Sequence, residues 1–197
     1  PMAIGNPMYH WTNLELHTYF GYDGVLNGDT AEEVWNLCNE KLQNDPKLTA
    51  RGLIAQSNVA FIGTTDAPID SLEWHEKIKN DPTIECIVGP SFRPDKAVNI
   101  QKPGFVEYMG KLAKSVGKEK LACIHCVLDA LTERLEFFVK MGCRAADHGL
   151  DYVPYREATL EEVNAIYQKA MAGEAVTVEE AEKYQTAILI HMGKLYH

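Results

Sequence analysis

The chain has 197 residues, of which 46% are hydrophobic and 24% are charged, a composition typical of one soluble globular domain or at most two small ones. Nineteen lysines and arginines against 28 aspartates and glutamates give a formal net charge of −9, which argues against a protein that binds nucleic-acid phosphates. The longest apolar runs, residues 59–63 and 187–190, are too short to span a bilayer, and no signal-peptide pattern opens the chain. We therefore expect a soluble, cytoplasmic protein with neither nucleic-acid nor membrane partners.

The two ends of the chain indicate a piece of a longer protein. The first residue is Pro1 rather than Met, and the last residue, His197, directly follows an apolar helical pattern with no helix breaker. We therefore expect that the sequence was cut from something longer.

Hydrophobic periodicity divides the chain into three regions, which we expect to form one truncated structural unit. Residues 1–57 and 151–197 are predicted to be helical, and residues 58–150 alternate between short strands and helices. Three capping-box patterns, which close the first turn of a helix, begin at Thr30, Thr159 and Thr177. The expected helices cover residues 6–20, 30–44, 48–57, 70–80, 104–116, 118–141, 159–172 and 177–196.

Three short apolar runs predict strands over residues 58–63, 84–88 and 143–146, the first ended by residues 64–68 and the second by Gly89-Pro90. Short buried strands that alternate with helices are typical of βα units around a parallel sheet. The chain is therefore either a small open α/β domain or a portion of a (β/α)8 barrel, because three strands are too few to close one. Both folds place function at the carboxyl ends of the strands.

Two charged side chains that follow expected strands are the main candidates for a small-molecule site. The Arg93 guanidinium matches a carboxylate with two parallel hydrogen bonds, and its alternative role is a structural ion pair with a neighbour such as Asp95. Asp147 could accept hydrogen bonds from substrate hydroxyls or move a proton, and its alternative role is to cap a helix or stabilise a loop.

Three further polar residues at the strand ends have simpler structural explanations. His148 could act as an acid, a base or a ligand, but a histidine before Gly149 more often stabilises a turn. Thr65 and Asp66 precede Pro68 and an expected helix, so the chemistry of helix entry explains them well. No P-loop, GxGxxG, GxSxG, His-x-His or His-Glu-x-x-His motif occurs, so the motifs indicate neither a complete metal site nor a nucleophile.

Five cysteines are too few and too scattered for a disulfide framework, and free thiols fit a reducing compartment. Cys123 and Cys126 have the CxxC spacing of a redox pair or of half a zinc site. No second CxxC accompanies them, and they fall inside the helix expected over residues 118–141. The simpler interpretation is two half-buried thiols on one helix face.

Several segments together resemble uronate isomerase (glucuronate isomerase), a divergent family of the amidohydrolase superfamily. They occur in the family's order with compatible spacing, and the resemblance covers nearly the whole chain, including the helix expected over residues 177–196. The similar segments are residues 5–16, 50–52, 59–72, 91–96 and 144–150.

The resemblance implies a portion of a distorted (β/α)8 barrel with additional helices, taken from the middle of a longer protein. It also implies an aldose–ketose isomerase that interconverts D-glucuronate with D-fructuronate or D-galacturonate with D-tagaturonate. A divalent metal, often zinc, is then expected in the full-length protein, but its ligands would lie outside this chain, which is expected to bind none alone.

By resemblance, Arg93 corresponds to an active-site arginine that binds the substrate, and Asp147 to a catalytic aspartate. The isolated chain is expected to be inactive and to associate with another copy or with the missing segments, since a truncated barrel exposes strand edges and apolar surface. Two alternatives stay open: a non-catalytic α/β module that binds a sugar acid through Arg93, and a helical interaction protein in which Arg93 and Asp147 face different directions.

Overall fold

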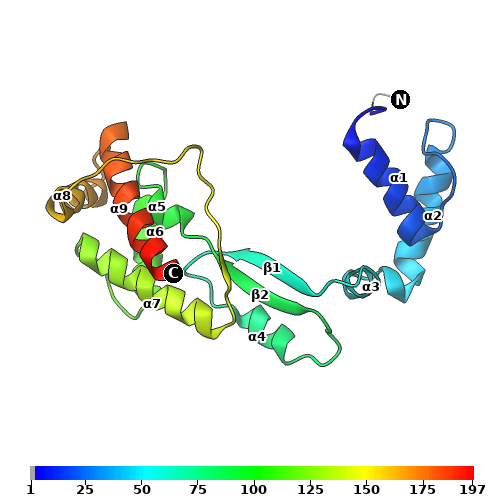
Figure 1. Cartoon of the computed structure of the whole chain (residues 1–197), viewed down its shortest axis with the longest axis horizontal. Coiled ribbons are helices and arrows are strands. Elements are labelled where there is room, and N and C mark those ends of the chain that lie inside the picture. Colours follow the sequence, from blue (N-terminus) through cyan, green and yellow to red (C-terminus); the bar gives the residue numbers. More distant parts are fainter. Residues whose placement is uncertain (1–2) are drawn as a thin grey trace. The chain divides into compact units, whose positions relative to one another are not determined.

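The computed structural model of the chain describes residues 3–197 and divides them into two units (Figure 1). The first unit extends to Ala60 and includes Pro82–Ile87, and the second comprises Phe61–Asp81 and Val88–His197. Hydrophobic periodicity divides the chain differently, into regions 1–57, 58–150 and 151–197. That these three regions form one structural unit stays a prediction. Within residues 3–197, no helix is long and apolar enough to cross a membrane.

The first unit is helical, as its periodicity predicts. Asn6 begins the first helix by accepting a hydrogen bond from the Met8 N–H at 2.9 Å. The capping box expected at Thr30 is wrong, because the Thr30 hydroxyl accepts the Asn27 N–H and donates to the Val25 carbonyl, both in the preceding loop, and accepts no N–H of the helix. The elements of this unit are α1 (Pro7–Phe20), α2 (Ala31–Asn44), a 3-10 turn (Pro46–Leu48) and α3 (Ala50–Gln56).

A three-stranded parallel sheet organises the second unit. Its order is β1-β2-β3, and Ser91 and Phe92 of β2 pair with Ala145 and Ala146 of β3. Alongside β1, the Arg93 N–H donates to the Asp66 carbonyl at 2.9 Å. The parallel α/β class expected from the sequence is confirmed, with strands β1 (Phe61–Asp66), β2 (Ile87–Phe92) and β3 (Ala145–Ala146).

The first two strands lie further along the chain than the sequence predicts. Asn58 has a left-handed backbone, with φ at 51°, and ends the turn after α3, so β1 cannot begin there. Residues 64–66 continue β1 rather than breaking it, as suits the two β-branched threonines. Gly89-Pro90 also lies inside β2. Pro90 precedes the paired residues Ser91 and Phe92, so its missing N–H removes no bond to β3.

Five of the helices of the second unit form where the sequence predicts them, although two of these begin later, and the short helix over Asp95–Val98 was not predicted. Leu72, with φ at 57°, delays α4 to Glu73, and Gly117 is followed by an irregular segment over residues 118–123, so α7 begins only at Ile124. Both remaining capping boxes are confirmed, at Thr159 and Thr177. The helices are α4 (Glu73–Lys79), α5 (Asp95–Val98), α6 (Phe105–Ser115), α7 (Ile124–Lys140), α8 (Leu160–Met171) and α9 (Val178–Tyr196).

The core of the second unit lies between its helices and one face of the sheet. Two buried tyrosines stack with their ring centroids 6.4 Å apart, and their hydroxyls donate to backbone carbonyls. Tyr167 donates to Leu121 at 2.8 Å, and Tyr184 donates to Ala97 at 3.1 Å. These bonds satisfy the phenol groups, so the rings contribute apolar packing without an unsatisfied polar atom.

The two faces of the sheet have different surroundings. Phe92 packs against Phe138 of α7 and is fully buried, whereas Phe61 of β1, on the other face, is 49% exposed. A Cβ added to Gly63 would lie 3.4 Å from the Ser91 hydroxyl and 3.5 Å from the Phe61 ring, so these positions share a face. We name this side the open face, defined by Phe61, Gly63, Thr65, Gly89, Ser91, Arg93, Ala145 and Asp147.

Candidate functional site

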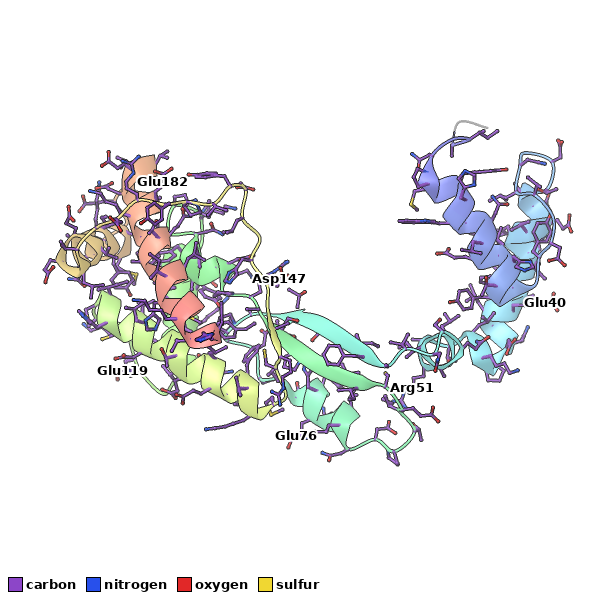
Figure 2. All side chains as sticks on the ribbon, viewed as in Figure 1. Glu40, Arg51, Glu76, Glu119, Asp147 and Glu182 are labelled. Carbon is purple, nitrogen blue, oxygen red and sulfur yellow. The ribbon has the colours of Figure 1, made fainter. Side chains whose placement is uncertain are left out.

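Arg93 and Asp147 contact each other at the ends of two adjacent strands. The sheet pairs them directly: the Asp147 N–H donates to the Phe92 carbonyl at 3.0 Å, which continues the register of β2 and β3 by one residue. Their side chains then form an ion pair between Arg93 Nη2 and Asp147 Oδ2 on the open face. Figure 2 shows Asp147 near the end of the sheet where β1 and β2 terminate. The sequence-predicted pair therefore lies at one place.

Asp95 is the second anionic neighbour of Arg93 and holds the loop that carries Asp147. Its Oδ2 lies 3.7 Å from Arg93 Nε, and its two oxygens accept the Gly149 N–H at 3.0 and 3.1 Å. The expected alternative of a structural contact between Arg93 and Asp95 is thus present together with the Asp147 pair. A side chain at position 149 would crowd this link, because an added Cβ would lie 2.7 Å from Asp95 Oδ2.

The exposure of the Arg93–Asp147 pair limits its value for stability. The Arg93 side chain is 39% exposed and the Asp147 side chain 43% exposed. Pairs in such positions contribute about 0–1 kcal/mol to folding, because water screens them. Within residues 3–197, Arg93 Nη1 and Asp147 Oδ1 make no hydrogen bond to the protein. The pair therefore presents one donor group and one acceptor atom to a ligand.

His148 packs against Tyr196 at the end of α9. Its Nε2 lies 3.2 Å from the Tyr196 hydroxyl, and its Nδ1 is buried without a hydrogen-bond partner among the described residues. Burial lowers the pKa of His148 below its ordinary value, while the nearby Asp95 and Asp147 carboxylates act in the opposite direction. The turn-stabilising role stays a prediction, and Tyr196 is a partner that the sequence alone did not indicate.

Thr65 and Asp66 separate onto opposite faces of β1, because side chains alternate along a strand. Thr65 lies on the open face, in the row that contains Ser91. Asp66 lies on the covered face and accepts a hydrogen bond from the Thr64 hydroxyl at 2.6 Å, while the same hydroxyl lies 2.7 Å from Nε2 of the buried His75. An ionised carboxylate only accepts, so Thr64 donates to Asp66 and the His75 Nε2–H donates to Thr64. This network secures α4 to β1.

Basic side chains gather beside the site. A cavity of about 480 Å³ shares Asp95 and Gly149 with the cluster just described, and its wall also carries Lys96, Lys102 and Lys111. Glu107 and Asp95 are the acidic residues of the same wall, where Lys111 pairs with Glu107 at 2.7 Å, and Lys102 lies 4.0 Å from Asp151 beside it. These carboxylates offset most of the positive charge of the wall.

The described residues of this chain offer no ligand set for the metal that the resemblance implies in the full-length protein. Among residues 3–197, no group of three or more histidine, cysteine, aspartate and glutamate side chains could hold a metal ion. Asp147 uses one carboxylate oxygen for Arg93, which leaves a single oxygen rather than a ligand set.

Comparisons with known proteins agree on one family. The sequence profile of the glucuronate isomerase family matches residues 1–197. The uronate isomerase of Lachnospira eligens is 53% identical over 196 residues, which cover 100% of this chain and 42% of that protein. The crystal structure of uronate isomerase from Thermotoga maritima, 32% identical, superimposes with a TM-score of 0.92 over 100% of this chain and 42% of its own.

A more distant structure shows the same fold. The glucuronate isomerase of Caulobacter crescentus, 23% identical, superimposes with a TM-score of 0.88 over 98% of this chain and 40% of its own. The chain thus spans about 42% of the length of the relatives that it matches. The expected portion of a larger α/β fold is confirmed, and the chain belongs to the glucuronate isomerase family.

Proposed function

We propose that this chain supplies the Arg93–Asp147 pair to the substrate site of an isomerase that acts on hexuronates. The observation that carries the proposal is the contact between these two side chains, which come from different βα turns and meet on the open face. A helical interaction protein would need no such convergence. The names of the matched relatives, uronate isomerase and glucuronate isomerase, support the substrate class.

The proposed reaction moves two hydrogens within the substrate, one between carbons and one between oxygens, and needs no external redox partner. The C2–H bond of the aldose breaks, C1 gains a hydrogen, and a proton moves from the C2 hydroxyl to the C1 oxygen, so that the aldehyde is reduced as the alcohol is oxidised. Asp147 Oδ1 is available to accept a hydroxyl hydrogen or to hold the proton. Arg93 Nη1 is available to bind the substrate carboxylate.

We infer that a complete protein holds its divalent metal through residues outside this chain, since residues 3–197 offer no suitable ligand group. The roles proposed for Arg93 and Asp147 therefore concern binding, orientation and proton movement only. We further propose that the protein acts in the cytoplasm and associates through its open face, either with another copy or with the missing segments. The five cysteines form no disulfide, which supports a reducing compartment such as the cytoplasm. The exposed Phe61 supports association through the open face.

A chimera tests the proposed function. The 197 residues replace the matched segment of the Lachnospira eligens enzyme, which supplies the remaining parts, and conversion of D-glucuronate and D-galacturonate to their ketoses is measured. We expect the chimera to be active. Asp147→Asn should lower kcat by about a hundredfold or more, because the amide cannot take up the proton. Arg93→Lys should raise KM by about tenfold or more, because a single ammonium cannot pair with Asp147 through one nitrogen and offer a second N–H group to the substrate.

Arg144→Lys is the matched control, because Arg144 precedes β3 and donates to the Cys143 carbonyl rather than joining the ion pair. It should leave kcat and KM unchanged. A folded but inactive chimera would contradict the isomerase function, and full activity of Asp147→Asn would contradict the role of that residue. The isolated 197-residue chain should show no turnover. Its titration with D-glucuronate separately tests whether it binds a sugar acid without catalysis.

A further inference from the structure

Two thiols meet at the beginning of α7, in a part of the molecule that the proposed isomerase function does not use. Cys123 is the N-cap residue, with extended backbone angles of φ −154° and ψ 169°, and Cys126 lies in the first turn. Their sulfur atoms are 3.2 Å apart, and both side chains are half-buried rather than enclosed. The helix predicted over residues 118–141 placed both inside a regular helix, and the late start of α7 changes that arrangement.

Helix α8 holds the backbone on both sides of Cys123. The Asn164 side chain accepts the Ile124 N–H at 3.0 Å, and the Gln168 amide donates to the Ala122 carbonyl at 2.6 Å. The Tyr167 hydroxyl, fully buried, donates to the Leu121 carbonyl one residue earlier. Because these bonds fix the chain around the N-cap, the two sulfur atoms approach each other without further ordering of the backbone.

The surroundings of Cys126 favour its thiolate. The Cys123 thiol donates to it, and the N–H groups of Cys123 and Ala122 and the charge of Lys118 act in the same direction, so the pKa of Cys126 is lowered although partial burial opposes this. The thiolate is the form that attacks a disulfide. Cys126 is therefore suited to attack a disulfide, and the Cys123 thiol lies close enough to attack the mixed disulfide that results.

We propose that Cys123 and Cys126 form a redox-active dithiol that a small-molecule disulfide, such as oxidised glutathione, converts reversibly to an intramolecular disulfide. The Cys126 thiolate attacks one sulfur of the reagent, its S–S bond breaks, and one reduced thiolate leaves. Cys123 loses its proton and attacks the Cys126 sulfur, so the mixed disulfide breaks and the second reduced thiolate leaves. The protein loses two protons and two electrons, and the reagent is reduced to two thiols.

Two thiols could instead contribute to a metal site, but the rest of the neighbourhood does not support this. A structural zinc site needs four ligands, and among residues 3–197 no third histidine, cysteine, aspartate or glutamate completes a group with this pair. His125 lies between the cysteines in sequence, but its side chain is exposed. Thiol–disulfide exchange needs only the two sulfur atoms that the structure brings together.

Peptide mapping of the 197-residue chain tests the proposal directly. The chain is incubated with oxidised glutathione, free thiols are blocked by alkylation, and trypsin releases residues 121–134, which contain only these two cysteines. We expect this peptide to lose two hydrogen atoms without gaining glutathione, and dithiothreitol to restore both thiols. The closed form should exceed the glutathione adduct by about tenfold or more, because the second thiol acts intramolecularly.

Single variants and an unpaired cysteine provide the controls. Cys123→Ser should stop the reaction at a glutathione adduct on Cys126, and Cys126→Ser should leave at most a slow adduct on Cys123. Cys86, which is also half-buried but has no sulfur neighbour among the described residues, should form only the adduct. The proposal is overturned if the wild-type peptide accumulates glutathione adducts on both cysteines, or if both thiols stay open to alkylation. Neither readout depends on isomerase activity.

Discussion

Phe92 of β2 and Phe138 of α7 meet edge to face, with their ring centroids 5.0 Å apart and their planes at 88°. Both side chains are fully buried, so this contact joins the covered face of the sheet to the helix behind it. The residue after Phe92 is Arg93. The packing of Phe92 therefore fixes the position of β2, and with it the position of Arg93, the proposed substrate-binding residue.

Phe92→Ala should destabilise the second unit by about 3–5 kcal/mol, the range found when a buried phenylalanine is truncated in a packed core. Phe61→Ala is the matched control on the neighbouring strand, because that side chain is 49% exposed and loses little buried area. Chemical denaturation followed by tyrosine fluorescence measures both. Equal losses of stability in the two variants would contradict the assignment of covered and open faces.

Gly149→Ala should impair the active chimera without unfolding it. The new methyl group would lie 2.7 Å from Asp95 Oδ2, so the carboxylate that accepts the Gly149 N–H must move and disturb Arg93. Displacements of this size in a catalytic site lower kcat/KM by about tenfold to a hundredfold. Gly110→Ala, in α6, places its methyl group in open space and should leave kcat/KM unchanged. Similar kinetics for both variants would show that the Asp95–Gly149 link does not affect the site.

Acid should weaken the second unit through His148. Burial lowers its pKa in the folded chain, so the unfolded chain binds this proton more readily. The free energy of unfolding is then constant above the unfolded pKa of about 6.5 and falls as the pH drops from there toward the folded pKa. Denaturation at pH 5.5 and 7.5 should show a smaller difference for His148→Gln than for the wild type. The control, His125→Gln at an exposed position, should keep the wild-type difference.

The capping box of α9 should contribute measurably to local stability. The Thr177 hydroxyl accepts the Glu180 N–H at 3.2 Å, and the Glu180 carboxylate accepts the Thr177 N–H at 2.8 Å. Thr177→Ala should therefore cost about 1 kcal/mol, and Thr177→Ser should restore most of it. Amide hydrogen exchange along α9 measures the effect. If serine and alanine give the same exchange rates, the hydroxyl is not the stabilising group.

Local signals predict the fold well where they act alone. The capping boxes at Thr159 and Thr177 need only residues within one turn, and both form as predicted. The same pattern at Thr30 does not form a capping box, because the Thr30 hydroxyl donates to the Val25 carbonyl. Val25 lies in a loop, where hydrophobic periodicity gives no signal. The observed strand ends differ from the predicted ones for a similar reason. Glycine and proline are typical of turns, and Gly89 and Pro90 belong to β2 only because of their neighbours in the sheet.

The site was predictable in its members but not in its geometry. The sequence order places Arg93 and Asp147 after two strands, whereas their direct pairing depends on the register of β2 and β3. Thr65 and Asp66 are adjacent in sequence and lie on opposite faces, which becomes evident only once β1 is known to extend to Asp66. Side-chain alternation would have separated them had the strand end been correct.

The two stacked tyrosines of the second unit make its unfolding at alkaline pH visible by absorbance. Burial raises the pKa of both Tyr167 and Tyr184 above that of a free phenol, and each hydroxyl is already committed to a carbonyl. Neither ring can become a phenolate while the helices around it stay closed. The ultraviolet absorbance of ionised tyrosine from these two rings should therefore rise only as the helices separate.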